Sequence, residues 1–272
     1  MFDHVNMKNY FQRLFSILSF NTLIALFIAI GSTAICIHYE WKMDFPLTII
    51  GIAVVFPIVF SIGGAYNRRE SALVQYGIMK SMGRAIFLAS RDWLRDDGKK
   101  VSDNLTNFKS HTFNIFTLCV LLFQNSKNEH FSDEEKEIYR EFSNISKSIE
   151  DLRDRGLSGS EVSRVNAYLS RFITAFETLK HIYQYRTPRT LRLYSKIFIY
   201  IILVVLGPYF SLIAEGKALW LGFITPILFA MVFTGLDNIQ EHLENPFDQI
   251  GEDDIKINPE KFIQTLESNV ID

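Results

Sequence analysis

The chain has 272 residues, of which 48% are hydrophobic and 21% are charged. Its net charge of −2 gives no basic excess of the kind that favours nucleic-acid binding, so we expect no nucleic-acid partner. The two cysteines, Cys36 and Cys119, show neither a disulfide framework nor a metal-binding spacing, and each is expected to pack as a small hydrophobe. Apolar and charged residues lie in separate blocks, which indicates an integral membrane protein.

The chain opens with a short polar segment, residues 1–13, and Leu14–Ile37 follows without a charge. This run is too long for the apolar part of a signal peptide and lacks a small-residue cleavage site, so it is predicted to be the first transmembrane helix. The polar connector that follows contains Tyr39 and Trp41, side chains that suit the interface between membrane and water.

The second uncharged run is Phe45–Tyr66, and a helix of about twenty residues crosses about 30 Å of hydrocarbon. Transmembrane helices 1 and 2 are therefore assigned to residues 14–66. Within the second run, Ile52, Phe56 and Phe60 recur at every fourth residue and share one helix face. We interpret this face as the lining of a pore, although periodicity in an apolar run is equally compatible with packing or lipid contact.

Residues 67–196 are charged and are predicted to form a large cytoplasmic region made of helices, because basic residues close to a span mark the cytoplasmic side. Two helix starts fit the capping box, in which Ser132 precedes Glu135 and Ser158 precedes Glu161. The segment Phe108–Gln124 is apolar but contains two polar side chains, His111 and Asn114. It is interpreted as a helix buried in protein rather than as a span.

Two further uncharged runs, Ile197–Ala214 and Ala218–Leu236, assign transmembrane helices 3 and 4 to residues 197–236. The Gly207-Pro208 pair is expected to bend the first of them. Four spans with short outer loops put both termini in the cytoplasm, and residues 237–272 form a cytoplasmic tail. The predicted fold is thus an all-α membrane protein with four transmembrane helices per subunit.

Motifs of enzymatic chemistry are absent from the sequence, so the chain is not expected to be an enzyme. None of the four uncharged runs contains Asp, Glu, Lys or Arg, whereas transporters and pumps usually keep such groups within the membrane. A passive pore needs none of them. Two other functions stay open, a membrane-tethered interaction module without conduction and a transporter of a small solute.

Two stretches resemble the bestrophin family of ion channels. Tyr66–Gly77 is similar to the family's Y-(D/N)-R-W-W-E-A-R-K-L-W-G stretch, and Leu236–Phe247 is similar to the segment that ends in (E/D)-(N/D)-P-F. The resemblance implies a homopentamer in the cell membrane that conducts inorganic ions, mainly chloride, although some prokaryotic relatives prefer cations. It requires no cofactor.

The resemblance also implies that Ile52, Phe56 and Phe60 form the apolar neck of the pore, because the neck lies just before the first motif in this family. Rings of such residues around a common axis would gate by dewetting. The edges of phenylalanine rings carry a partial positive charge, which favours anions modestly without a fixed charge.

The resemblance further implies a second, cytoplasmic constriction, for which Val162 is the candidate; the alternative is that Val162 is the first core residue of its helix. After the second motif come Glu252, Asp253 and Asp254, where animal relatives bind calcium through carboxylate oxygens. The short acidic run and the compact four-span form look more like the prokaryotic branch, in which calcium gating is not the rule. A solvated acidic loop or a salt bridge between subunits is therefore the alternative.

Overall fold

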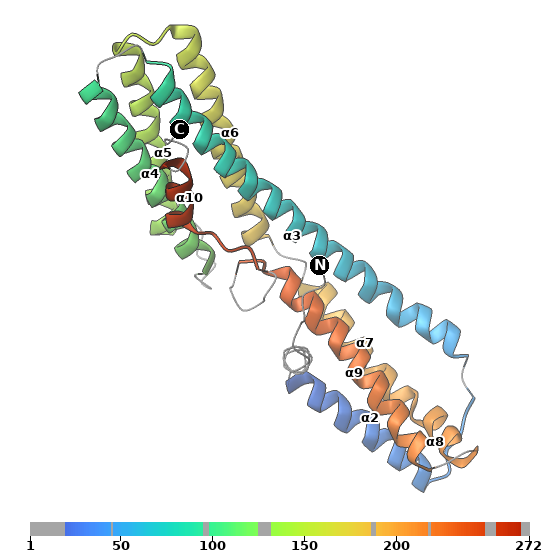
Figure 1. Ribbon diagram of the computed structural model, residues 1–272. Coiled ribbons are helices and arrows are strands. Elements are labelled where there is room, and N and C mark those ends of the chain that lie inside the picture. Colours follow the sequence, from blue (N-terminus) through green and yellow to red (C-terminus); the bar gives the residue numbers. More distant parts are fainter. Residues whose placement is uncertain are drawn as a thin grey trace, which may run out of the picture. The chain divides into compact units, whose positions relative to one another are not determined.

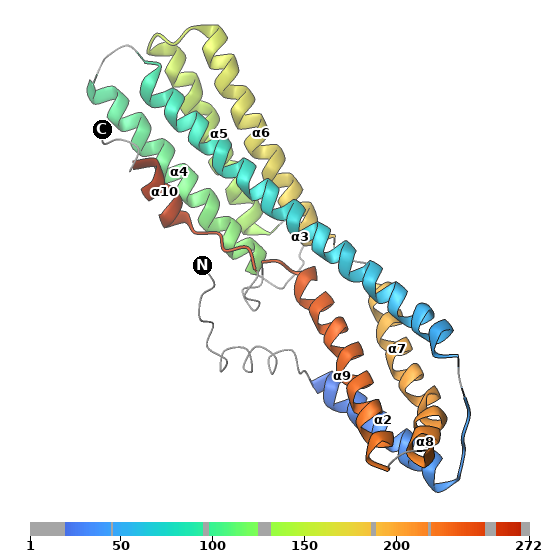
Figure 2. The same ribbon diagram turned by 45° about the vertical axis from the view of Figure 1, so that its right-hand side comes forward.

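The computed structural model describes residues 20–44, 46–94, 98–124, 132–185, 189–216, 219–247 and 254–267. These residues form helices and connecting segments, with no strand among them (Figures 1 and 2). The helices are α2 (Phe20–His38), α3 (Leu47–Asp92), α4 (Gly98–Gln124), α5 (Asp133–Asp154), α6 (Gly159–Gln184), α7 (Arg189–Val205), α8 (Gly207–Gly216), α9 (Leu219–Glu244) and α10 (Pro259–Glu267). The predicted all-helical class is confirmed.

The chain folds as two compact units, each made of two stretches of sequence. Unit 1 comprises Met1–Asn67 and Thr187–Glu244, and unit 2 comprises Arg68–Arg186 and Asn245–Asp272. Helix α3 contributes its first part to unit 1 and its second part to unit 2.

Unit 1 packs α2, α7, α8 and α9 against one another (Figures 1 and 2), and Ile58 and Ile62 from the start of α3 join their apolar core. In the described part of the chain, three helical stretches are long and apolar enough to cross a membrane, namely Phe20–His38, Leu193–Glu215 and Leu219–Glu244. The predicted span Phe45–Tyr66 corresponds to the start of α3, part of which lies outside the described side chains. Helix α3 continues through Pro57 without ending.

The Gly207-Pro208 pair ends α7 and begins α8, so the predicted interruption is present. Proline has no amide hydrogen, which leaves the carbonyl of Val204, four residues earlier, without its helical donor. The hydroxyl of Ser32 on α2 donates to this carbonyl at 2.9 Å. A Cβ at Gly207 would lie 2.3 Å from that hydroxyl oxygen, so glycine is needed where the two helices meet.

Unit 2 consists of the second part of α3 with α4, α5, α6 and α10 around an aromatic core. Phe116 illustrates the packing, because its ring centroid lies 4.9 Å from that of Phe262 on α10 and 6.0 Å from that of Phe172 on α6. The thiol of Cys119 is fully buried here, and burial raises its pKa. Both cysteines are free and buried, as expected for packed hydrophobes.

Local sequence signals are confirmed at both predicted helix starts of unit 2. The hydroxyls of Ser132 and Ser158 accept hydrogen bonds from the amides of Glu135 and Glu161 and so cap α5 and α6. The segment with His111 is part of a buried helix, as predicted, although α4 begins earlier, at Gly98. His111 Nδ1 donates to Glu141 at 2.6 Å, which makes it a contact between α4 and α5.

Candidate functional site

The predicted neck residues form an uncovered apolar stripe on α3. Ile52, Phe56 and Phe60 are 63%, 60% and 64% exposed in the single chain. The rings of Phe56 and Phe60 contact each other edge-to-face, with centroids 4.4 Å apart. The structure therefore places the three side chains together on one face, with no covering from the rest of the described chain.

The opposite face of α3 carries the contacts with unit 1. Each residue turns a helix by about 100°, which puts Ile58, Ser61 and Ala65 on the side away from the stripe. These three residues are 2%, 6% and 1% exposed. These buried side chains orient helix α3 within unit 1, and the bulky stripe stays exposed in the single chain.

Exposure alone does not say what covers the stripe. Phe27 on α2 is 78% exposed and Val232 on α9 is 58% exposed, as expected for side chains that contact lipid. The stripe differs from these residues in its position, because it directly precedes the Tyr66–Gly77 motif on the same continuous helix. The assignment of the stripe as the neck therefore depends on its position before the motif. The exposure of the three side chains agrees with this assignment but does not distinguish them from lipid-facing residues.

The first motif makes structural contacts within unit 2. The guanidinium of Arg68 donates to the carbonyl of Ile182 at 2.8 Å, in the last turn of α6. Such carbonyls lack a partner inside their own helix, so a basic side chain satisfies one of them. Arg69 pairs with its neighbour Glu70 at 2.6 Å. Together these residues explain why the motif carries charge directly after the apolar run.

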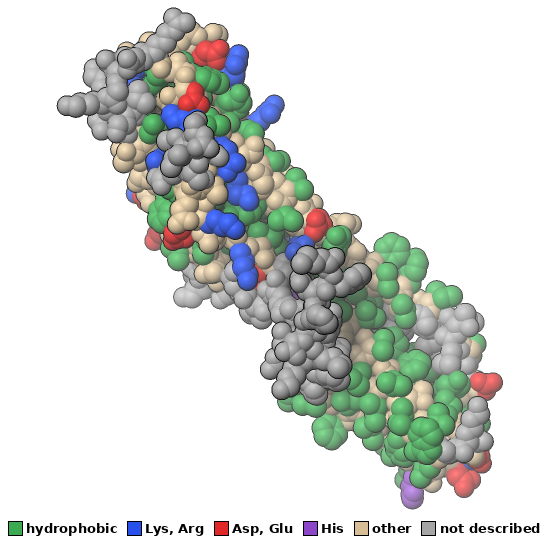
Figure 3. Space-filling view, in the orientation of Figure 1, with side chains coloured by type: hydrophobic (Ala, Val, Ile, Leu, Met, Phe, Trp, Pro, Cys, Tyr) green, Lys and Arg blue, Asp and Glu red, His purple; other side chains and the backbone are tan. Residues whose placement is uncertain are grey.

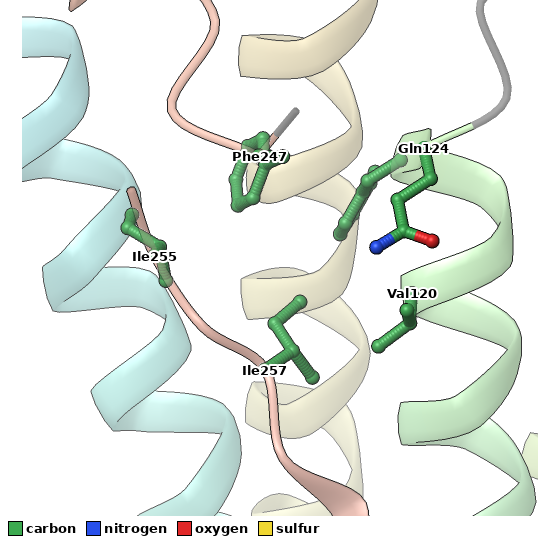
Figure 4. A pocket seen from close by; sticks show the side chains of 6 residues that line it. Val120, Gln124, Phe247, Ile255 and Ile257 are labelled. Carbon is green, nitrogen blue, oxygen red and sulfur yellow. The ribbon is translucent and has the colours of Figure 1, made fainter. Parts of the chain in front are cut away.

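The second motif anchors the tail. The ring of Phe247 is 2% exposed and lies 4.6 Å from the ring of Phe123, in a stacked arrangement. The amide of Ile255 donates to the carbonyl of Pro246 at 2.8 Å, which closes the loop between them. Figure 4 shows Phe247, Ile255 and Ile257 lining a small pocket together with Val120 and Gln124 near the end of α4. The Asn-Pro-Phe sequence thus holds both ends of the acidic loop against unit 2.

The predicted acidic residues are only partly within the described chain. Glu252 and Asp253 lie outside the described residues, and Asp254 is half-buried. Among the described residues, no group of three or more His, Cys, Asp or Glu side chains is arranged to hold a metal ion.

Val162 lies in the first turn of α6, where its amide donates to the carbonyl of Ser158 at 3.0 Å. Its side chain is half-buried and packs against the core of unit 2. The structure therefore places Val162 beside the core of unit 2, whereas the predicted neck residues belong to unit 1.

The family model for bacterial and fungal bestrophin proteins matches residues 7–272. The chain belongs to the bestrophin family. A bestrophin homologue from Klebsiella pneumoniae, solved by zinc phasing, shares 16% identity with a TM-score of 0.73, over 92% of this chain and 96% of that chain. A variant of the same homologue gives a TM-score of 0.74 at 16% identity, over 92% and 95%. At this identity the likeness to bestrophin structures establishes the fold.

A third solved structure, described as a membrane protein, has a TM-score of 0.74 at 17% identity, over 93% of this chain and 98% of that chain. A comparison with curated proteins gives no match. Bestrophin membership and the fold support an ion channel in a membrane rather than an enzyme. Both motifs found in the sequence lie within the matched residues, so the expectation of a bestrophin is confirmed.

Sequence reasoning missed one buried polar cluster and one groove. Lys180 on α6 contacts Glu135 at 2.9 Å and Glu177 at 2.7 Å, and its ammonium donates to the Tyr139 hydroxyl at 2.6 Å. The sequence also showed no sign of a groove between α3 and α10 that is lined by basic residues. The start of helix α10 could have been predicted locally, because in Asn258-Pro259 a capping residue precedes a proline in the first turn. The structure shows this cap, since the Lys261 amide donates to Asn258 Oδ1 at 2.8 Å.

Proposed function

We propose that the chain is one subunit of a passive, anion-conducting channel, in which several copies turn Ile52, Phe56 and Phe60 toward a common axis. The observation that carries the proposal is the uncovered stripe on α3 directly before the first bestrophin motif. Family resemblance supports five copies and chloride as the main ion. In this arrangement the start of α3 is the fourth span beside the three apolar stretches, and both termini are cytoplasmic.

The neck would control the flow of ions through how readily water wets its apolar surface. Three successive rings of isoleucine and phenylalanine narrow the conduit and give water no hydrogen-bond partner, so a tight neck empties and blocks ions. Residues 47–66 contain no Asp, Glu, Lys, Arg or His, so no fixed charge selects the ion there. The phenylalanine edges would then supply the modest preference for anions.

Replacing phenylalanine in the neck should increase flux. In Phe56→Ala and Phe60→Ala proteoliposomes we expect a rise of roughly tenfold in chloride efflux, because a barrier lowered by about 1.4 kcal/mol changes a rate tenfold. The matched control is Phe27→Ala, which removes an even more exposed ring from α2 and should leave efflux unchanged. Equal effects of all three substitutions, or no flux from the wild-type protein, would contradict the proposal.

A cation-preferring channel is the second candidate, because the absence of a fixed charge in residues 47–66 leaves the sign of the conducted ion open. Reversal potentials across asymmetric potassium chloride separate the two, since their sign shows which ion crosses more readily. A tethering module predicts no current, and a transporter predicts slow, saturable uptake.

Two further parts of the proposal concern the cytoplasmic region. Val162 is proposed as a second constriction, so Val162→Ala should raise the conductance. The control is Val165→Ala on the same helix, and Val162→Ala should lower the melting temperature by no more than this control does.

Glu252, Asp253 and Asp254 are proposed as carboxylate ligands for calcium, in a loop whose ends are fixed by the Pro246–Ile255 hydrogen bond. Calcium titration of wild-type and Glu252→Gln/Asp253→Asn protein tests this part; equal responses would exclude it.

A further inference from the structure

Unit 2 contains a groove of about 520 Å³ between α3 and the segment that leads into α10. Such a volume is typical of a site for a small organic molecule and is far larger than a single monatomic ion needs. Figure 3 shows Lys and Arg side chains gathered in a band over the region where these two elements lie. The groove is lined by Tyr76, Gly77, Lys80, Ser81, Arg84, Lys256, Asn258, Lys261, Phe262 and Thr265.

Two pairs of cations face each other across this groove. Lys80 and Arg84 lie one turn apart on α3, and Lys256 and Lys261 come from the opposite side. The lining contains four basic residues and no Asp or Glu. Within the part of the chain that the structure describes, none of the four is in an ion pair. Four like charges at one groove repel one another, and a bound anion would relieve that repulsion.

The two sides of the groove are fixed to each other rather than merely adjacent. The Asn258 amide donates to the hydroxyl of Tyr76 on α3 at 3.4 Å. The guanidinium of Arg84 donates to the Thr265 hydroxyl at 3.2 Å, and Phe262 packs against the core behind them. Lys80 is held with its ammonium 4.5 Å from the centre of the Tyr76 ring. These contacts hold Lys80 and Arg84 beside an open space, and the exposed Lys256 and Lys261 line its other side.

The chemistry of the lining favours a multiply charged oxyanion such as phosphate over a singly charged carboxylate. Arg84 uses one donor on Thr265 and keeps others of its planar fork, which match two phosphate oxygens at once. Three ammonium groups add point charges, and Ser81 and Asn258 add neutral polar groups to the lining. A carboxylate with a single charge would leave most of these cations unneutralised.

We propose that the groove between α3 and α10 binds a phosphate monoester or oligophosphate group, held between Lys80 and Arg84 on one side and Lys256 and Lys261 on the other. The group can belong to a soluble molecule or to a lipid with a phosphomonoester headgroup, such as phosphatidic acid, because both present the same three phosphate oxygens. This site is separate from the neck on α3 and does not require that the protein conducts chloride.

Calorimetric titration of the detergent-purified, full-length protein with tripolyphosphate tests the site. Lys80→Gln/Arg84→Gln and Lys256→Gln/Lys261→Gln should each weaken binding at least about tenfold, since each removes two charge-assisted contacts. The matched control is Lys136→Gln/Lys147→Gln, which removes the same charge from exposed positions on α5 and should change the Kd by less than about twofold.

Conservative variants guard against loss of folding. Lys256→Arg/Lys261→Arg keeps both charges and should bind as the wild type does, with an unchanged melting temperature. Equal weakening by the control pair would mean that tripolyphosphate senses only net charge, and it would overturn the proposal. The absence of binding to the wild-type protein, in detergent and in lipid, would overturn it as well.

Nanodiscs distinguish the two sources of phosphate. In discs of phosphatidylcholine with added phosphatidic acid, a headgroup that reaches the groove should compete with tripolyphosphate and weaken its binding, and Lys256→Gln/Lys261→Gln should abolish the competition. A soluble ligand predicts the same tripolyphosphate affinity in discs with and without phosphatidic acid. Either result supports the site and assigns its source.

Discussion

Lys180 is the residue that most clearly departs from the ordinary behaviour of its type. It is 8% exposed, and a buried charge is tolerated only when it is paired and hydrogen-bonded. Burial lowers its pKa, but contacts with Glu177, Tyr139 and Glu135 outweigh that effect, so the pKa is raised above the usual lysine value. Burial raises the pKa of Glu177, and hydrogen bonds from Lys180 and Tyr139 reverse this, so the pKa of Glu177 is lowered overall.

Removing the ammonium should therefore destabilise unit 2. Lys180→Met leaves the buried Glu135 without its cation, and loss of one partner of a buried pair costs about 3 kcal/mol. Lys136→Met is the control, because its contact with Asp133 is exposed and contributes less than about 1 kcal/mol. Thermal unfolding in detergent measures both; equal shifts in melting temperature would contradict this account of the cluster.

The same cluster predicts a pH dependence. A carboxyl group whose pKa is lowered on folding stabilises the fold above its unfolded pKa, and this contribution is lost as the pH falls through the folded pKa. Glu177 has an ordinary value of 4.5, so the stability difference between the wild type and Lys180→Met should be full at neutral pH and should shrink below that value. If the stability difference between the wild type and Lys180→Met grew as the pH fell, ionised Glu177 would not be its source.

Among the elements, α9 approaches α8 so closely that glycine is required. A Cβ on Gly222 would lie 2.4 Å from the Cβ of Ala214 and 3.2 Å from the carbonyl oxygen of Phe210. Gly222→Ala should cost about 1–3 kcal/mol, because backbone atoms must move apart. Gly31→Ala on α2 meets nothing within 4 Å and should be neutral or stabilising, since alanine is the better helix former. Melting temperatures that shift equally would refute the close approach.

Elements with local signals could be predicted from the sequence, and contacts between distant segments could not. Ser132 and Ser158 carry their caps within three residues, so the starts of α5 and α6 follow from spacing. The stripe on α3 could be recognised as a face, but what covers it depends on other copies or lipid. Lys80 and Arg84 meet Lys256 and Lys261 only because the tail folds back onto α3, and no local pattern encodes that meeting.

For the whole molecule, the number of subunits is the prediction on which the neck depends. A single chain leaves Ile52, Phe56 and Phe60 uncovered, so a closed ring of identical contacts is the arrangement that converts one stripe into a constriction. Five copies of the 31.5 kDa chain have a mass of about 158 kDa, which native mass spectrometry of detergent-purified protein resolves from four or six copies.

The Phe56→Ala/Phe60→Ala protein should retain this mass, because the stripe is proposed to face the conduit and not the contacts between neighbours. A monomeric wild-type protein would remove the physical basis of the neck. An oligomer that dissociates in the double variant, while Phe27→Ala remains assembled, would instead assign the stripe to the interface between subunits. The mass measurement thus separates a lining role from a packing role for side chains that are equally exposed in one chain.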